Sequence, residues 1–195
     1  MARGPRYRVP YRRRREAKTD YRARRVLATS ERPRFVVRSS DRNIRIQLVT
    51  SKIEGDYVLA QAESRELVDY GWLGGRKNTP ASYLLGYLAG FRSLKVGIKE
   101  ANLDIGLARP TKGSRVFASV KGAKEAGLEI PCDSDVLPEP SRIEGGKISE
   151  YANSIEDPLE YERMFSGYMK RGLNPLELPI HFKAVKERIE EDNAA

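Results

Sequence analysis

The chain has 195 residues, of which 39% are hydrophobic and 32% are charged, and its net charge is +9. This length suits one domain with extensions, and the single cysteine, Cys132, excludes an internal disulfide framework. The first residues are charged and lack the apolar core of a signal peptide. The longest uncharged run, residues 78–91, is shorter than the roughly 20 residues of a membrane span. We therefore expect a cytoplasmic protein with no membrane contact.

The first 25 residues carry the entire excess of positive charge. They contain eleven basic and two acidic residues, a net charge of +9, whereas residues 26–195 contain 25 of each. A block of like charge repels itself and has no apolar face to bury, so this arm is expected to be disordered on its own. Ten of the eleven cations are Arg, which suits bidentate contact with phosphate and stacking on bases. The sequence therefore predicts a polyanion as the partner of the arm.

The arm, which we end at residue 27, also contains three tyrosines that are candidates for stacking on bases or sugars, namely Tyr7, Tyr11 and Tyr21. Two prolines, Pro5 and Pro10, favour an extended course for its first third. From Tyr11 onward it contains no helix-breaking residue, so we expect a helix to form there when the partner binds.

A body of α/β class is predicted for residues 28–131. Strands are expected at residues 34–38, 43–50 and 57–62, separated by polar turns, and these form an antiparallel meander. A long helix follows, then a short buried strand at 103–108. A second helix, capped by Ser114, is ended by Gly127. The βββαβα order predicts a mixed sheet.

The long helix is predicted to start with Thr79 as its N-cap and Pro80 at the first helical position, and to run to about Asn102. Its apolar side chains recur at helical spacing. Two glycines on the same helix face, Gly86 and Gly90, are interpreted as allowing the helix to approach the sheet closely.

The remaining residues, 132–195, are expected to form an irregular linker and a helical C-terminal extension. Helices are predicted at residues 146–154, 158–171 and 179–192. The middle helix has the clearest start, because Asp157 and Glu160 flank Pro158 in the pattern of a capping box.

No catalytic or metal site is indicated. His181 is the only histidine and has no nucleophile motif nearby, and one Cys with one His does not make a zinc site. An all-carboxylate Mg²⁺ site stays open, although Asp133–Asp135 is interpreted as a solvated turn. The glycine-rich segment 71–78 lacks the order of a phosphate-binding loop. We expect no enzyme activity, no cofactor, no metal and no small-molecule substrate.

Two further segments are candidates for RNA contact. The hairpin tip Arg38–Asn43 offers arginines, hydroxyls and an amide just after the arm, which is consistent with a joint RNA-facing surface. An ordinary polar hairpin, which is common, is the alternative interpretation. Residues 76–78 lie beside a helix N-terminus, where backbone N–H groups favour an anion. A plain helix cap is an equally good interpretation of that loop.

The predicted RNA-binding residues therefore come from the arm, the hairpin tip and the loop before the long helix. They are Arg3, Arg6, Tyr7, Arg8, Tyr11, Arg12, Arg13, Arg14, Arg15, Lys18, Tyr21, Arg22, Arg24, Arg25, Arg38, Ser39, Ser40, Arg42, Asn43, Arg76, Lys77 and Asn78.

Five blocks, in order along nearly the whole chain, resemble one known family. They are the arm itself and the segments Arg32–Val49, Tyr70–Gly90, Leu103–Pro131 and Pro140–Ala152. On these residues the chain is similar to large-subunit ribosomal protein eighteen, in its archaeal and eukaryotic branch. Bacterial members are shorter and eukaryotic ones extend further, so the length is of archaeal type.

The resemblance implies a structural protein that binds 5S rRNA and helps to attach it to the large-subunit rRNA at the central protuberance, beside neighbouring ribosomal proteins. Two alternatives share the basic arm. A DNA-binding protein would need a helix-turn-helix, zinc finger or basic zipper pattern, and none is visible. An RNA-modifying enzyme would need a catalytic constellation or a cofactor loop, and none is visible either.

Overall fold

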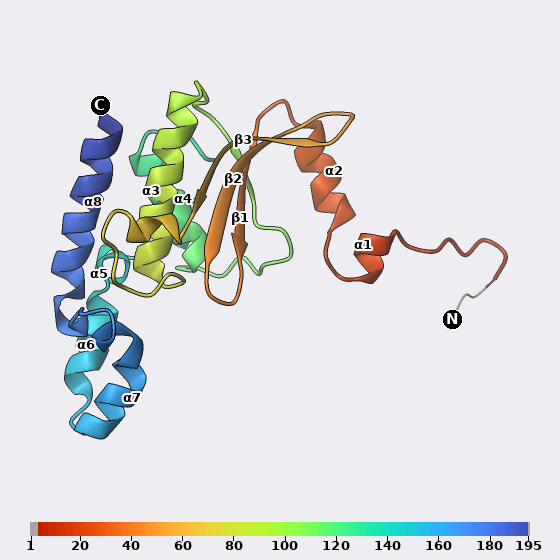
Figure 1. Ribbon diagram of the computed structural model, residues 1–195. Coiled ribbons are helices and arrows are strands. Elements are labelled where there is room, and N and C mark those ends of the chain that lie inside the picture. Colours follow the sequence, from red (N-terminus) through yellow and green to blue (C-terminus); the bar gives the residue numbers. More distant parts are fainter. Residues whose placement is uncertain (1–3, 195) are drawn as a thin grey trace.

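A four-stranded mixed sheet forms the centre of the computed structural model, which describes residues 4–194 (Figure 1). The three strands after the arm are β1 (Arg34–Ser39), β2 (Ile44–Ser51) and β3 (Asp56–Glu63). They pair antiparallel, and β4 (Asn102–Asp104) adds to β1 in parallel, giving the order β3-β2-β1-β4. The predicted α/β class, the meander and the mixed sheet are therefore confirmed.

The fourth strand is shorter than the sequence predicted. It ends at Asp104 and not at Ala108, because a turn follows at once. The Asp104 carboxylate accepts a hydrogen bond from the Gly106 N–H at 2.9 Å, and Gly106 has a φ of +63°. Glycine adopts this left-handed backbone at little cost, so the chain leaves the sheet here.

One face of the sheet holds the hydrophobic core. In β2 the buried Ile44, Ile46 and Leu48 alternate with more exposed side chains, as the period of a strand requires. In β1 residues 34–37 are all buried, and Phe35 is fully so. This face is covered by α3 (Thr79–Lys95) and α4 (Arg115–Glu125). The order of strands and helices in the body is therefore the predicted βββαβα.

Both ends of α3 differ from the prediction. Its N-cap is Asn78 and not Thr79, because the Asn78 side chain accepts a hydrogen bond from the Ala81 N–H at 2.9 Å. Pro80 therefore occupies the second helical position. The helix ends at Lys95, some seven residues early, because Gly97 takes a φ of +81° and its N–H bonds back to the Leu94 carbonyl at 2.8 Å.

The glycines of α3 face the neighbouring helix and not the sheet, which corrects the prediction. A Cβ on Gly86 would overlap the backbone carbonyl of Ser119 in α4, and one on Gly90 would crowd Ala123 and Ala126. Reciprocally, Gly122 of α4 lies against the Tyr83 backbone of α3. The small residues thus let the two helices pack at backbone distance.

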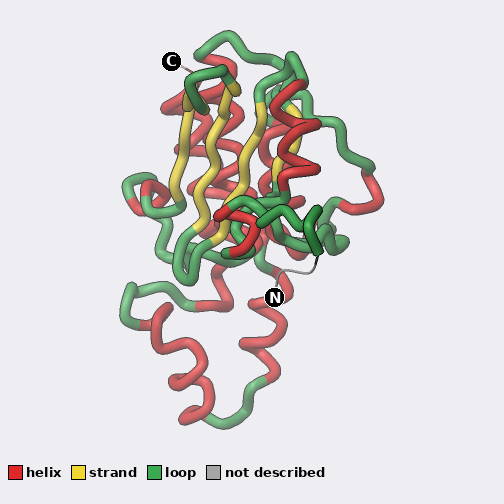
Figure 2. Tube along the Cα trace, turned by 90° about the vertical axis from the view of Figure 1, so that its right-hand side faces the viewer, coloured by secondary structure: helices red, strands yellow, loops and turns green. Residues whose placement is uncertain are grey.

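The C-terminal residues form four helices, α5 (Pro140–Glu144), α6 (Gly146–Ser154), α7 (Pro158–Met169) and α8 (Leu178–Ala194). The predicted cap of α7 is confirmed, since Asp157 accepts a hydrogen bond from the Leu159 N–H at 3.0 Å. The sequence did not predict α5, which is only five residues long and is followed by its C-cap Gly145, whose φ is +91°. Figures 1 and 2 show α6 and α7 projecting from one end of the body as a separate lobe.

The last helix belongs to the core. Phe182, Val185 and Ile189 of α8 are buried in the same cluster as the sheet residues, and α8 runs along the side of the molecule opposite the arm (Figure 1).

His181 accepts a hydrogen bond from the Leu73 N–H at 3.0 Å and stacks on Trp72, with ring centroids 5.3 Å apart. Burial and the nearby Arg188 lower the pKa of His181. Its contacts are structural.

None of the helices between residues 4 and 194 combines the length and the apolar character that a membrane-spanning segment needs. No group of three or more His, Cys, Asp or Glu side chains in this part of the chain is placed to hold a metal ion.

Candidate nucleic-acid interface

The basic arm is partly folded in the structure. Two helices follow an irregular stretch, α1 (Arg12–Arg15) and α2 (Tyr21–Thr29) (Figure 1). The expected continuous helix is broken at Ala17, which has a φ of +50°, and Asp20 then caps α2 by accepting hydrogen bonds from the N–H groups of Arg22 and Ala23. The arm thus contains two short helices in the segment where the sequence argument expected one continuous helix.

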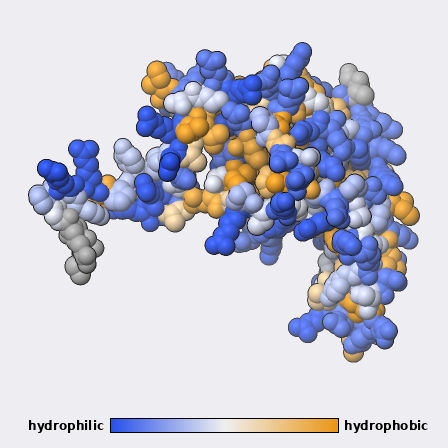
Figure 3. Space-filling model, turned by 180° about the vertical axis from the view of Figure 1, so that it is seen from behind, coloured by the Kyte–Doolittle hydropathy of each residue, from blue (hydrophilic) through white to orange (hydrophobic). Residues whose placement is uncertain are grey.

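Most cations of the arm face solvent. Arg3 lies outside the described residues. The exposed basic side chains between residues 4 and 25 are Arg6, Arg8, Arg12, Arg13, Arg14, Arg15, Lys18, Arg22 and Arg25. Figure 3 shows the arm projecting from the body with a predominantly hydrophilic surface. This exposed charge is available to a polyanion.

The tyrosines of the arm are not equivalent. The rings of Tyr11 and Tyr21 pack on each other with centroids 5.0 Å apart, which joins the start of α1 to the start of α2. Tyr11 still has 72% of its surface exposed, and Tyr7 has 47%. Both of these rings therefore keep a face that a base can stack on.

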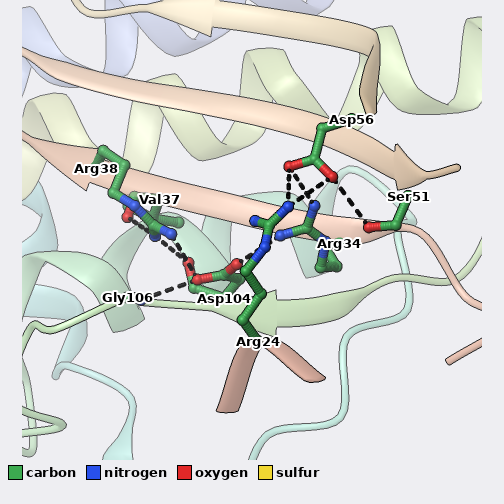
Figure 4. A network of polar contacts seen from close by, with 8 residues as sticks. All are labelled: Arg24, Arg34, Val37, Arg38, Ser51, Asp56, Asp104 and Gly106. Carbon is green, nitrogen blue, oxygen red and sulfur yellow. Dashed lines mark hydrogen bonds and ion pairs between the residues drawn. The ribbon is translucent and has the colours of Figure 1, made fainter. Parts of the chain in front are cut away.

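The second arm helix lies against the outer face of the sheet, opposite the core. A buried arginine, Arg34 of β1, organises this face (Figure 4). Its guanidinium lies between two carboxylates, 2.8 Å from Asp56 of β3 and 3.0 Å from Asp104 of β4. Because its side chain is only 3% exposed, both carboxylates are needed to stabilise the buried charge.

Two more arginines extend this network outward. Arg24 of α2 donates to both oxygens of Asp56 at 2.9 and 3.0 Å, which ties the arm to the sheet. Arg38, at the end of β1, donates to the Asp104 carboxylate at 2.6 Å and to its backbone carbonyl at 2.7 Å. We refer to Arg24, Arg34, Arg38, Asp56 and Asp104 as the outer-face network.

The two carboxyls of the network titrate at low pH. Burial alone would raise the pKa of Asp104, but hydrogen bonds and charge from Arg38, the Gly106 N–H and Arg34 outweigh it and lower this pKa. The same opposition acts on Asp56, where burial is outweighed by Arg24 and Arg34, and its pKa is also lowered. Both groups are therefore charged near neutral pH.

These shifts predict how folding stability depends on pH. Both pKa values are lower in the folded state than the ordinary 3.8, so the unfolded state binds more protons. The contribution of Asp56 and Asp104 is complete above that ordinary value and is lost as the pH falls through the lowered values. We expect the melting temperature to fall below about pH 4. In the Asp104→Asn variant the melting temperature should fall less steeply with decreasing pH than in the wild type. An equal dependence of melting temperature on pH in the two proteins would contradict this prediction.

The hairpin tip is shaped mainly by its own hydrogen bonds. Ser40 Oγ accepts from the Asn43 N–H at 3.1 Å and donates to the Asn43 carbonyl at 2.9 Å. Arg42 is exposed, and Ser39 and Asn43 help to line an open hollow of about 240 Å³. The guanidinium of Arg38 is held by Asp104, so its position is set by the network and not by the turn.

The structure brings the arm and the tip together. A hollow of about 240 Å³ between them is lined by Arg13 of α1, Lys18 of the α1–α2 connection and Arg24 of α2, and by Arg38 and Asp104 of the sheet. Cations from two predicted segments therefore share one surface.

The loop before α3 is placed differently. Asn78 caps the helix with its oxygen and donates from Nδ2 to the Tyr168 hydroxyl at 3.2 Å, so both ends of its amide are occupied. The Lys77 carbonyl accepts from Arg115 of α4 at 3.2 Å. Arg76 and Lys77 are half-buried. The loop packs towards α7 and α4, on the other side of the sheet from the arm (Figure 1).

Sequence reasoning missed part of the charge distribution. Residues 28–131 contain 17 basic and 11 acidic residues, a net charge of +6, and residues 132–195 contain 8 basic and 14 acidic ones, a net charge of −6. The zero balance after the arm conceals this opposition. Sequence reasoning also did not identify Arg34, Asp56 and Asp104 as members of a site. Strand alternation does place Arg34 on the face of the sheet opposite Phe35.

The sequence of this chain matches one family of known proteins. Residues 5–101 and 95–133 match the family described as ribosomal large subunit proteins 60S L5 and 50S L18. Three relatives are named large ribosomal subunit protein uL18. The one from Staphylothermus marinus is 52% identical and the alignment covers 98% of this chain and 96% of the relative. Those from Thermofilum pendens and Methanothermobacter thermautotrophicus are 53% and 50% identical, covering 98% of this chain and 98% and 100% of the relatives.

These matches define the class of protein as a structural constituent of the large ribosomal subunit, which is not a class of enzymes, and its location as the ribosome in the cytoplasm. The chain belongs to the family of ribosomal large subunit proteins 60S L5 and 50S L18. The resemblance inferred from the five sequence blocks is confirmed, and the compared relatives are archaeal, as the length predicted.

Proposed function

We propose that this protein binds 5S rRNA and helps to attach it to the large-subunit rRNA at the central protuberance. The observation that carries the proposal is the row of exposed arginines on an arm that is tied to the body through Arg24 and Asp56. Guanidinium groups pair with phosphate in a bidentate way, and release of counterions from the RNA adds to affinity. The choice of 5S rRNA rests on the resemblance of the sequence blocks.

The three predicted segments contribute unequally to the proposed RNA surface. The arm and the hairpin tip are proposed to form one contact region joined at Arg38, which lines both the hollow beside the arm and the hollow at the tip. The loop at Arg76 and Lys77 would be a separate contact, on the side of the body that faces α7. Asn78 contributes through the helix cap, because its amide is already hydrogen-bonded.

We propose a division of labour along the chain, with an arm at residues 1–27, a body at 28–131 and an extension at 132–195. The extension carries a net charge of −6, so RNA phosphates repel it on average. Within a large subunit, the neighbours that suit such a surface are other ribosomal proteins. Exposed apolar side chains on the lobe, including Leu159, Met164 and Met169, are consistent with contact to protein.

Copurification tests the proposal. The tagged full-length chain is purified at moderate salt from cells that express its ribosome, and the bound RNA is sequenced after subunits have been removed by sedimentation. We expect 5S rRNA to be enriched over other small RNAs. Recovered RNA with the composition of the total small-RNA pool would overturn the specific assignment and leave only a general cationic arm.

A further inference from the structure

Two carboxylates lie inside a surface that should attract a polyanion. Asp104 is nearly buried, with an 8% exposed side chain, and Asp56 is one-third exposed. Each forms ion pairs with two arginines of the outer-face network (Figure 4). A negative charge within a Debye length of about 8–10 Å from RNA phosphates repels them. Simple electrostatics therefore assigns Asp56 and Asp104 an unfavourable effect on RNA binding.

We propose that Asp56 and Asp104 are positioning residues for RNA binding, which hold Arg24 and Arg38 so that the arm and the hairpin tip face the same RNA. This inference rests on the proposed function. It gives the two acids a favourable effect on affinity, opposite in sign to their direct repulsion of phosphate.

The contacts of Asp56 show how the arm is oriented. Both of its oxygens accept from Arg24, at 2.9 and 3.0 Å, and the same carboxylate lies 2.8 Å from Arg34 and 3.2 Å from the Ser51 hydroxyl. Asp56 is therefore held in place from the sheet, since its partner Arg34 is buried there. Through its contact with Arg24, Asp56 sets the direction of α2. The packing of Tyr11 on Tyr21 then orients α1 relative to α2.

The contacts of Asp104 show how the tip is oriented. Its two side-chain oxygens accept from Arg38, from the Gly106 N–H and from Arg34, at 2.6, 2.9 and 3.0 Å. Its backbone carbonyl takes a further hydrogen bond from Arg38 at 2.7 Å. The Arg38 side chain is nonetheless 47% exposed. An exposed guanidinium that is already held in one orientation loses less conformational entropy when it meets a phosphate.

The two effects predict opposite results for a charge-neutralising variant. Full-length Asp56→Asn keeps the size of the side chain and removes its charge. If positioning dominates, its affinity for 5S rRNA at constant salt should fall by roughly tenfold, the cost of re-ordering a few side chains on binding. If repulsion dominates, its affinity should be equal or higher. Asp69→Asn, an exposed acid outside the network, is the matched control and should bind as wild type or slightly tighter.

A double-mutant cycle separates positioning from loss of folding. In a chain that lacks residues 1–25, Arg24 is absent, so Asp56→Asn should no longer change RNA affinity. Asp56→Glu should recover part of the loss in the full-length chain, because it can still bind Arg24. Circular dichroism at the binding temperature shows whether each variant is folded. Equal or tighter binding by Asp56→Asn, or the same loss without the arm, would overturn the inference.

The same measurements distinguish this inference from the proposed function. Wild type that shows no preference for 5S rRNA over an unrelated structured RNA would refute the proposed function. Wild type that prefers 5S rRNA, together with an Asp56→Asn variant of unchanged affinity, would refute only the positioning role.

Discussion

Deletion of residues 1–18 is expected to remove most of the affinity for RNA while the body stays folded. The deleted segment contains eight basic residues and one acidic residue, and from residue 4 onward none of its side chains belongs to the hydrophobic core. The cut leaves Asp20 to cap α2 and leaves the Arg24–Asp56 ion pair in place. If about six phosphate contacts are lost, the slope of log affinity against log salt should drop by about 4–5.

The control for this deletion removes charge elsewhere. Replacing three exposed cations of the C-terminal extension, Lys147, Arg163 and Lys170, with Gln should change the slope little, because that region is acidic and is proposed to face protein. Filter binding or fluorescence titration from about 0.1 to 0.5 M salt gives both slopes. A deletion variant with the wild-type slope would show that the arm is not the main contact.

Replacement of Arg34 by Leu is expected to destabilise the folded protein by about 3–5 kcal/mol, since removing one partner of a buried ion pair leaves the other charge uncompensated. Here two carboxylates, Asp56 and Asp104, lose their shared cation in the middle of the outer face. Some of that cost is offset because Arg24 and Arg38 remain bound to them. The free energy of unfolding from urea denaturation measures the effect.

Arg45→Leu is the matched control for this variant. Arg45 lies on the neighbouring strand, and its pair with Glu63 has an N–O distance of 3.3 Å, but its side chain is 57% exposed. Exposed pairs contribute about 0–1 kcal/mol, so the change in unfolding free energy should stay within that range. A loss of less than about 1 kcal/mol for Arg34→Leu would mean that the outer-face network contributes little to folding.

Local patterns in the sequence were sufficient to predict most strands and helices of the body. Alternation in β2 placed Ile44, Ile46 and Leu48 on the core face, and the spacing of Asp157 before Pro158 located the start of α7. The start of α3 was placed one residue late because Asn78 and Thr79 can both cap a helix. Only the hydrogen bond from Ala81 distinguishes them. Propensity cannot choose between two adjacent capping residues.

Local sequence patterns could not predict the contacts of the outer-face network. Arg34 and Asp104 are 70 residues apart in the sequence. No periodicity in the sequence relates a residue of β1 to the end of β4, the last strand along the chain. The arm was recognisable because its charge is contiguous. The attachment of the arm to the sheet was not recognisable, since the sequence does not distinguish Arg24 from the other arginines of the arm. The fold brings Asp56 beside Arg24, and the composition of the arm does not predict this contact.

The central claim is that the arm and the tip form a surface for one particular RNA. Its most direct test is the ratio of equilibrium affinities of the full-length protein for 5S rRNA and for an unrelated structured RNA of equal length, at about 0.15 M salt, with duplex DNA as a third ligand. We predict that 5S rRNA is preferred over both competitors, and that the preference persists as salt weakens all three. Equal affinity for the three ligands would contradict it.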